Sequence, residues 1–272
     1  MMPSKLALLS ALSLVCLNAL AEQPMNSIKQ SRDSCVAVVS QAGNSKGTGF
    51  LISQRYVVTC FHVVAALKTE PPNSVRWTLF TDLKVVTVDG EEIPARCISV
   101  PTPQDPAPIQ SDFAILELTR EPKSPLPSLE ISDGKITPDV GTEILFSGYP
   151  LQTPAMVTHK GMISGISPDS AIICVQAPVN KGNSGGAVIG HDGKVCGIIS
   201  MREGGIGRGL TELKVYIDAT SKNGSVTLMG VDPLQAINAL IGTLDVYIST
   251  GIGYAHSSKF ISEYLKRNPL KL

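Results

Sequence analysis

The sequence predicts an all-β fold, and three observations support this prediction. The 272-residue chain contains 24 glycines and 19 prolines, which suit many short strands joined by tight turns better than a helical bundle. Short apolar runs alternate with turn residues from residue 35 to residue 200. Only beyond residue 230 does the spacing of apolar residues become helical. The length allows one large domain or two smaller ones.

Seven strands are expected in the first half, where apolar runs are bounded by turn residues. They are Cys35–Val39, Gly49–Ile52, Tyr56–Cys60, Val75–Phe80, Val85–Val88, Ile93–Val100 and Phe113–Leu118. Pro101–Ser111 is rich in proline and should form a loop. The stiff connector PKSPLP, residues 122–127, predicts a boundary between residues 22–127 and residues 128–272.

The second half also begins with strand-like apolar runs, but its last part has the apolar spacing of helices. Its expected strands are Glu143–Ser147, Met156–Ile163, Ala171–Val175, Ala187–Ile189 and Val195–Ser200. Asp192-Gly193 between the last two predicts a hairpin, because glycine accepts the positive φ of a tight turn. Ser257–Arg267 predicts a helix with one apolar face, and Asp232–Leu244 is a second candidate helix.

The N-terminus has the pattern of an export signal. Lys5 precedes the apolar run Leu6–Leu17, and Ala19-Leu20-Ala21 is a small-residue cleavage site. Residues 1–21 are therefore expected to be removed, so that the mature chain begins at Glu22. A membrane anchor is the alternative, but the run is shorter than the ~20 residues a span needs. We expect a periplasmic or extracellular protein with no stable membrane anchor after cleavage.

Charge and cysteine content narrow the possible functions. The chain carries 23 basic and 23 acidic residues without a basic block, so a nucleic-acid partner is not expected. Five cysteines remain after cleavage, an odd number that leaves at least one unpaired within the chain. None has the spacing of a zinc site, and buried core thiols are the simplest interpretation. These five are Cys35, Cys60, Cys97, Cys174 and Cys196.

One short stretch raises the question of catalysis. Residues 181–188 read KGNSGGAV, and the surroundings of Ser184 match G-x-S-x-G, the nucleophile motif of α/β hydrolases. That class would need a downstream acid, Asp232 or Asp245, and His256 as the base. Its serine lies in a strand–turn–helix, however, whereas a short apolar run, a hairpin and another strand follow Ser184. The context argues against this class.

A second interpretation comes from motifs upstream. Residues 47–52 read GTGFLI, residues 56–64 read YVVTCFHVV, and residues 111–118 read SDFAILEL. Together with KGNSGGAV they place a histidine, an aspartate and a serine in this order, each at the end of a strand-like run. This arrangement resembles the trypsin-like serine proteases, and most closely their bacterial HtrA-type branch.

The resemblance covers residues 35–201 and resumes over residues 251–265. It implies two six-stranded antiparallel β-barrels of the chymotrypsin type, with a C-terminal helix. His62 and Asp112 would come from the first barrel and Ser184 from the second. The active site would then lie between the barrels.

The family template assigns a role to each of these residues. Ser184 would be the nucleophile, and His62 the general base that activates its weakly nucleophilic hydroxyl. Asp112 would orient His62 and stabilise its charged form. The backbone N–H groups of Gly182 and Ser184 would form the oxyanion hole.

The resemblance also implies where substrate binds. Ile199, Ser200 and Met201 lie on the strand that pairs with the substrate backbone, with Ser200 near the aspartate. Pro178 and Val179 lie where the specificity pocket should begin. No acid stands at Pro178, so we expect a small or medium apolar P1 residue rather than arginine or lysine.

The sequence departs from the family pattern at three places. Asn183 replaces the aspartate that pairs with a new N-terminus in the digestive proteases, so zymogen activation of that kind is not expected. No PDZ module is expected, because the chain ends at Leu272, just after its terminal helix. Arg202–Thr250 is an insertion of about 50 residues, far longer than an ordinary connection. It could be a lid or exosite, or structural padding.

The remaining candidates have plainer interpretations. His159, His191 and His256 lack a catalytic context and are expected at the surface or in loops. Asp105 is a rival for the acid, but it lies in the proline-rich loop. We therefore expect an exported serine endopeptidase that acts on polypeptides without a metal or cofactor. The alternatives are a non-catalytic binding protein with the protease fold and, less favoured, an α/β-hydrolase-type esterase.

Overall fold

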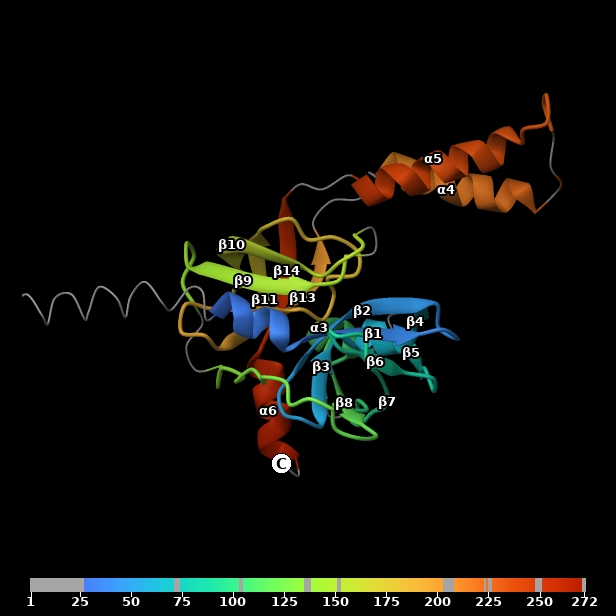
Figure 1. Ribbon diagram of the computed structural model, residues 1–272. Coiled ribbons are helices and arrows are strands. Elements are labelled where there is room, and N and C mark those ends of the chain that lie inside the picture. The colour runs from blue at the N-terminus through green and yellow to red at the C-terminus, as the bar shows by residue number, and fades with distance from the viewer. Residues whose placement is uncertain are drawn as a thin grey trace, which may run out of the picture.

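The protein consists of two closed β-barrels, a C-terminal helix and a projecting helical hairpin (Figure 1). The computed structural model describes residues 27–70, 74–102, 105–134, 138–150, 153–202, 208–222, 224, 227–247 and 251–270. The predicted signal peptide lies outside these residues. None of the helices they form is long and apolar enough to cross a membrane.

The first barrel closes in the strand order β1-β2-β3-β8-β7-β6. Every neighbouring pair is antiparallel. Its strands are β1 (Cys35–Ser40), β2 (Ser45–Leu51), β3 (Tyr56–Thr59), β6 (Lys84–Val86), β7 (Glu92–Cys97) and β8 (Ala114–Leu118). Each corresponds to a strand expected from the apolar runs, because these runs are buried, on both faces in β1 and β3 and on one face in β7.

The second barrel closes in the order β10-β11-β14-β13-β12-β9, again with antiparallel neighbours. Its strands are β9 (Glu143–Gly148), β10 (Val157–Ile166), β11 (Ile172–Gln176), β12 (Ala187–Ile189), β13 (Val195–Arg202) and β14 (Ile252–Ser257). The predicted fold of two six-stranded antiparallel barrels is therefore confirmed.

One strand pair lies outside both barrels. β4 (Ala65–Glu70) and β5 (Ser74–Leu79) form a separate two-stranded sheet. β5 was expected as a strand, but β4 was not, because its sequence AALKTE consists mostly of residues that favour helices. Antiparallel pairing with β5 overrides this local preference.

Two apolar cores hold the barrels. One lies within the second barrel, around Phe146, Ile163 and Ile173. The other fills the first barrel and extends to residues of the second barrel, including Ile189 and Ile198. The two barrels are therefore joined by continuous apolar packing.

The C-terminal helix α6 (Lys259–Arg267) lies along the first barrel (Figure 1). Its Tyr264 ring packs edge-on against Phe113, with ring centroids 5.7 Å apart, and its hydroxyl donates to the Ile98 carbonyl at 3.1 Å. This helix was expected from its apolar spacing. Residues 27–33 also form a helix, whose Ser31 hydroxyl bonds that of Ser147 at 2.8 Å.

The expected insertion contains two helices rather than one. α4 spans Arg208–Ser221 and α5 spans Pro233–Tyr247. α5 corresponds to the candidate helix at Asp232–Leu244, and the Asp232 carboxylate caps it by accepting from the Leu234 amide at 2.9 Å. α4 was not among the helices expected from the sequence.

Candidate active site

His62 lies on the single-turn helix α2 (Phe61–Val64), which follows β3. Its ring atom Nδ1 lies 2.8 Å from Asp112 Oδ2, and its backbone N–H donates to Asp112 Oδ1 at 3.1 Å. The His62 side chain is 37 % exposed, so Asp112 holds it from the inside while the ring reaches the surface.

Asp112 is placed by a tight backbone turn. It follows the short helix α3 (Pro108–Ser111) and has a left-handed conformation with φ 36° and ψ 48°. Aspartate is among the few residues that tolerate this region. Its carboxylate is buried and also accepts a hydrogen bond from the Ser200 hydroxyl. Three donors thus satisfy a carboxylate that would otherwise be costly to bury.

The two groups shift each other's pKa. Burial alone would lower the pKa of His62, but the hydrogen bond and negative charge of Asp112 together raise it above 6.5. Burial would raise the pKa of Asp112, but the hydrogen bonds and charge of His62 and the Ser200 hydroxyl lower it below 3.8. Asp112 is therefore ionised at neutral pH.

Ser184 lies in the loop between β11 and β12, which requires glycine at two places. Gly182 and Gly185 have φ of 97° and 94°. A Cβ atom on Gly185 would lie 1.9 Å from the Thr48 carbonyl oxygen, so the close approach of the loop to β2 also excludes a side chain. The glycines around Ser184 therefore let the loop pack against the first barrel.

Two backbone amides of this loop remain available. Within the described part of the chain, neither Gly182 nor Ser184 donates its N–H to another group. The Ser184 hydroxyl donates to the Ser200 carbonyl at 2.9 Å, and no hydrogen bond joins it to His62 among the described residues. His62 and Asp112 are thus brought into contact, whereas the Ser184 hydroxyl is turned to β13.

Thr48 joins the serine loop to the first barrel, a role that sequence reasoning missed. Its backbone N–H donates to the Ser184 carbonyl at 2.8 Å, and its hydroxyl donates to the Gly182 carbonyl at 2.6 Å. The same hydroxyl accepts from the Tyr149 amide at 3.0 Å. Thr48 belongs to the GTGFLI motif, but nothing in that motif shows which residues it binds across the barrels.

Ile199 supports the loop from the second barrel. Its side chain is buried, its N–H donates to the Gly186 carbonyl at 2.9 Å, and its carbonyl accepts from the Gly185 amide at 2.7 Å. Its expected role toward substrate is therefore not supported, because both backbone groups are already used. Of Met201 the structure describes the backbone, which pairs with Tyr254, and its side chain lies outside the described part.

Cys60, His62 and Asp112 place three potential metal ligands within 4.8 Å of one another. Burial, followed by the charge of Asp112, raises the pKa of the Cys60 thiol well above its ordinary value. The thiol donates to the Ile199 carbonyl at 3.1 Å. A protonated, hydrogen-bonded thiol is a poor metal ligand, so we interpret Cys60 as a core residue. The other four cysteines expected as core thiols are also free, but Cys97 and Cys174 are only half-buried, so the expectation of buried thiols holds for Cys35, Cys60 and Cys196.

The expected specificity residues differ in their placement. Pro178 is exposed, whereas the Val179 side chain is buried, at 2 % exposure. A Cβ atom on Gly253 would lie 2.3 Å from a methyl carbon of Val179. Val179 therefore fills the space beside β14, and Pro178 does not.

Asn183 is fully buried beside Ser184. Neither atom of its side-chain amide has a hydrogen-bond partner in the described part of the chain. A Cβ atom on Gly148 would lie 2.8 Å from Asn183 Oδ1, so the amide packs tightly. A carboxylate here would be a buried charge without a partner, which explains in physical terms why a neutral amide occupies the position.

The other histidines and the rival acid lie apart from this arrangement. His191 is exposed in a turn as expected, but His159 is half-buried in β10 and His256 is buried in β14, so the expectation of surface positions was wrong for these two. The His159 ring packs against Phe146, with ring centroids 5.0 Å apart. His256 follows the core residue Ala255 in β14, so it lies on the opposite side of that strand, against which α3 packs. Asp105 pairs with Arg267 at 2.9 Å and does not replace Asp112.

The strand that follows Ser184 also decides between enzyme classes. Ser184 leads into β12 and not into a helix, and both halves of the chain form antiparallel barrels. The α/β-hydrolase interpretation, with His256 as the base, is therefore wrong. A nucleophile elbow needs a helix directly after its serine.

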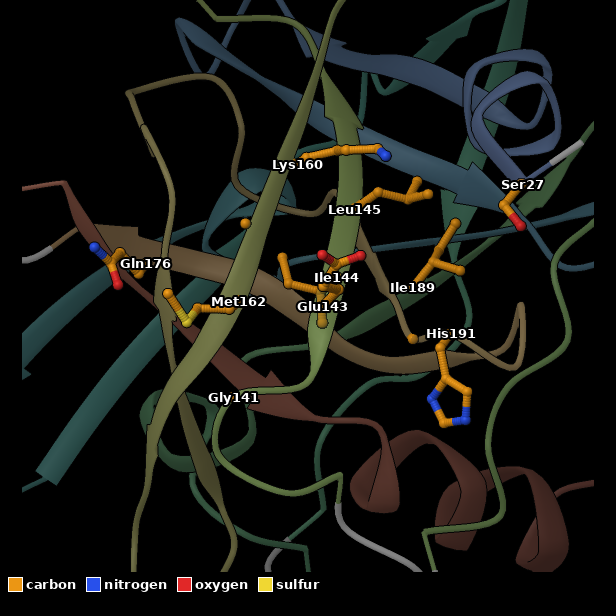
Figure 2. Close-up of a pocket in the computed structure, with 12 residues that line it drawn as sticks. Ser27, Gly141, Glu143, Ile144, Leu145, Lys160, Met162, Gln176, Ile189 and His191 are labelled. Atoms are coloured by element: carbon orange, nitrogen blue, oxygen red, sulfur yellow. The ribbon is translucent and has the colours of Figure 1, made fainter. Parts of the chain in front are cut away.

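A hollow of about 630 Å³ lies on the second barrel (Figure 2). Figure 2 shows Glu143 and Leu145 of β9, Lys160 and Met162 of β10, and Ile189 of β12 around it. None of the residues expected to act in catalysis lines it, so its size does not make it the candidate active site.

Comparison with known proteins relates the chain to peptidases. Residues 47–198, more than half of the chain, match the family model of the trypsin-like peptidase domain. A Brucella suis protein described as a probable periplasmic serine endoprotease, DegP-like, is 30 % identical over 196 residues, which are 67 % of this chain and 34 % of the relative. A Chlamydia pneumoniae protein with the same description is 32 % identical over 212 residues, which are 71 % and 38 % of the two chains. The chain spans about a third of the length of these relatives.

Solved structures show the same fold at lower identity. The serine endoprotease from Yersinia pestis has a TM-score of 0.54 and 18 % identity, and the match covers 89 % of this chain and 64 % of that one. An inactive form of Rv3671c from M. tuberculosis has a TM-score of 0.53 and 17 % identity, with 90 % and 92 % covered.

Replacing Thr48 by valine should weaken the junction between the barrels. Valine keeps the shape but leaves the buried Gly182 carbonyl without its donor, so we expect the free energy of unfolding to fall by about 1–3 kcal/mol. Chemical denaturation measures this loss. Thr48→Ser, which keeps the hydroxyl, is the matched control, and equal stability of the valine and serine variants would contradict the role of the hydroxyl.

The pH titration of His62 should depend on Asp112. Because its pKa is raised in the folded protein, protonated His62 stabilises the fold below about pH 6.5, and this contribution is lost as the pH rises through the folded pKa. NMR titration should give a His62 midpoint above 6.5 that falls in Asp112→Asn. Asp105→Asn is the control, since it removes a carboxylate that pairs with Arg267. A midpoint that does not change in Asp112→Asn would contradict the assignment.

Proposed function

The chain belongs to the trypsin-like peptidase family, and we propose that it is an exported serine endopeptidase that hydrolyses polypeptides through His62, Asp112 and Ser184. The observation that carries this proposal is the pairing of His62 with the buried, ionised Asp112, next to a loop that offers Ser184 and two unpaired amides. No other histidine of the described chain pairs with a buried carboxylate.

In the proposed reaction His62 acts as the base. The hydrogen bond between His62 Nδ1 and Asp112 keeps the proton on Nδ1, so Nε2 remains free to accept the proton of the Ser184 hydroxyl. The serine oxygen attacks the substrate carbonyl, and His62 then donates the proton to the leaving amine. In the second half of the reaction, His62 takes a proton from a water molecule, and this water attacks the acyl-enzyme carbonyl. His62 then returns the proton to the Ser184 oxygen, which is released.

The attack requires a change at Ser184. Its hydroxyl donates to the Ser200 carbonyl, so it must turn away from β13 before His62 can take its proton. The Ser200 carbonyl would then be free to accept a hydrogen bond from the substrate backbone. Binding of a peptide along β13 would thereby favour the reactive position of the hydroxyl.

The Gly182 and Ser184 amides would stabilise the oxyanion that forms on the substrate. Preorganised donors of this kind are worth more than donors that must reorient during the reaction. Thr48 supports this arrangement, because its hydroxyl binds the Gly182 carbonyl and so orients the peptide units of the loop.

Val179 would limit the substrate side chain at P1. Its buried side chain fills the space beside Gly253, which would leave room for a small or medium apolar residue. Because residue 178 is a proline and not an acid, the pocket has no carboxylate there to attract a P1 arginine or lysine. The descriptions of the relatives as periplasmic, together with the export pattern of residues 1–21, support a location outside the cytoplasm.

A non-catalytic binding protein is the second candidate. The observation that favours it is the Ser184 hydroxyl, which bonds the Ser200 carbonyl and not His62. The two candidates differ in one property, the reactivity of Ser184 toward an agent that needs an activated serine.

A fluorophosphonate probe should label Ser184, because the probe reacts with serines that a base activates. Labelling should be lost in Ser184→Ala and reduced by about 10³-fold or more in His62→Ala, since those residues act as a unit. Mass spectrometry of the labelled peptide locates the adduct. His191→Ala, which changes an exposed histidine in a turn, is the control and should label normally. A wild-type protein that stays unlabelled would support the binding protein.

The P1 preference should respond to Val179. Val179→Ala opens space beside Gly253, so we expect the ratio of kcat/KM for P1 leucine over P1 alanine to rise by about tenfold or more. A peptide library with a varied P1 position measures this ratio. Pro178→Ala is the control at the exposed neighbouring position. If Pro178→Ala shifts the preference and Val179→Ala leaves it unchanged, Val179 does not limit the pocket.

A further inference from the structure

The hairpin formed by α4 and α5 buries few side chains between its helices. The two helices have 14 and 15 residues and lie side by side, away from the barrels (Figure 1). Among their described side chains, only Ile217 and Ile241 are buried. Helices of this length are marginal in water on their own, so the hairpin needs further packing to be stable.

Ile217 and Ile241 mark the side of each helix that faces the other. In α5 the exposed residues Ile237 and Leu240 come four and one positions before Ile241, and Leu244 comes three after it. At 100° per residue, all three side chains point to the same side of the plane that contains the two helix axes.

α4 repeats this arrangement. Leu213 and Tyr216 come four and one positions before Ile217, and both are exposed. Because the helices are antiparallel, equal offsets from the inward residue fall on the same face of the hairpin (Figure 1). The hairpin thus has one apolar face, which we define as Leu213, Tyr216, Ile237, Leu240 and Leu244; these side chains are 37–64 % exposed.

The opposite face is polar. Lys214 and Asp218 in α4, and Asn238 in α5, lie on it, and the Asn238 amide donates to Asp218 Oδ1 across the helices at 3.1 Å. The hairpin is therefore a two-helix layer with one polar face and one apolar face. Such a layer becomes stable when a second layer covers its apolar side.

The charge of the hairpin argues against a lipid surface as the second layer. Residues 208–247 contain four acidic and three basic residues. Helices that bind anionic membranes carry an excess of lysine and arginine on their polar face. The apolar face itself has no charged side chain that would select an acidic or basic partner.

We propose that the apolar face packs against the same face of a second copy of this chain. Two identical two-helix layers would form a four-helix bundle around a twofold axis, in which each face is its own complement. The apolar face contributes five apolar side chains from each copy, fewer than the 20–30 residues per side of a standard interface. The dimer should therefore be reversible, with a dissociation constant in the micromolar range.

Dimerisation through the apolar face does not require protease activity, so a monomeric protein could still be a protease and an inactive protein could still form the dimer. Sedimentation velocity of the purified protein should show monomers shifting to dimers between about 1 and 100 µM. Leu240→Glu would bury a charge at the centre of the apolar face, and we expect it to raise the dissociation constant by about tenfold or more.

Val215→Glu is the matched control. Val215 is also an exposed apolar residue, at 65 %, but it lies two positions before Ile217 and so points away from both the partner helix and the apolar face. The Val215→Glu variant should dimerise with the same dissociation constant as the wild-type protein. Circular dichroism and thermal melting show whether each variant is folded, and Leu240→Ala, which should also weaken the dimer, replaces Leu240→Glu if the latter is not.

The proposal would be overturned by a wild-type protein that sediments as a monomer throughout the range. It would equally be overturned by glutamate variants that behave alike, or by dimers that Leu240→Glu leaves intact. A monomer that binds reduced, unfolded casein and loses this binding in Leu240→Glu would also overturn it, and would identify the apolar face as a docking site for substrate.

Discussion

The contact between the two barrels depends on a set of buried hydrogen bonds, and the candidate active site depends on that contact. Thr48 of the first barrel binds the carbonyls of Gly182 and Ser184 in the second. From the second barrel, the Ser200 hydroxyl donates to the carboxylate of Asp112 in the first barrel. These groups are buried, so losing one partner leaves another unsatisfied at a cost of about 1–3 kcal/mol. Apolar packing also joins the barrels, and the bonds of Thr48 hold the Ser184 loop against the first barrel.

The same constraint explains the local strain around the site. Asp112 has a positive φ, and Gly182 and Gly185 have backbone conformations that other residues rarely adopt. Such conformations persist only where the surroundings hold them. The turn at Asp112 presents its carboxylate to both His62 and Ser200, and the glycine loop exposes two amides. Each barrel alone contains only part of this arrangement.

Much of the fold was predictable because the barrel strands are short apolar runs bounded by turn residues, and β1, β3, β9 and β12 are buried over almost their whole length. β4 was missed because pairing with β5 overrides the helix preference of AALKTE. For the site, the motifs identify His62, Asp112 and Ser184 as candidates. They could not identify the role of Thr48, whose hydroxyl bonds a residue 134 positions away, or the orientation of the Ser184 hydroxyl. Long-range contacts and side-chain rotation leave no local pattern, and for the same reason the buried Val179 could not be distinguished from the exposed Pro178.

A crystal structure of the protein after reaction with a fluorophosphonate would test most directly whether the two barrels together form a catalytic site. We predict a phosphonyl group on Ser184, with its oxygen accepting hydrogen bonds from the amides of Gly182 and Ser184. His62, still paired with Asp112, should lie within hydrogen-bond distance of the adduct. An unmodified Ser184 that still donates to Ser200, or an adduct on another residue, would contradict the account.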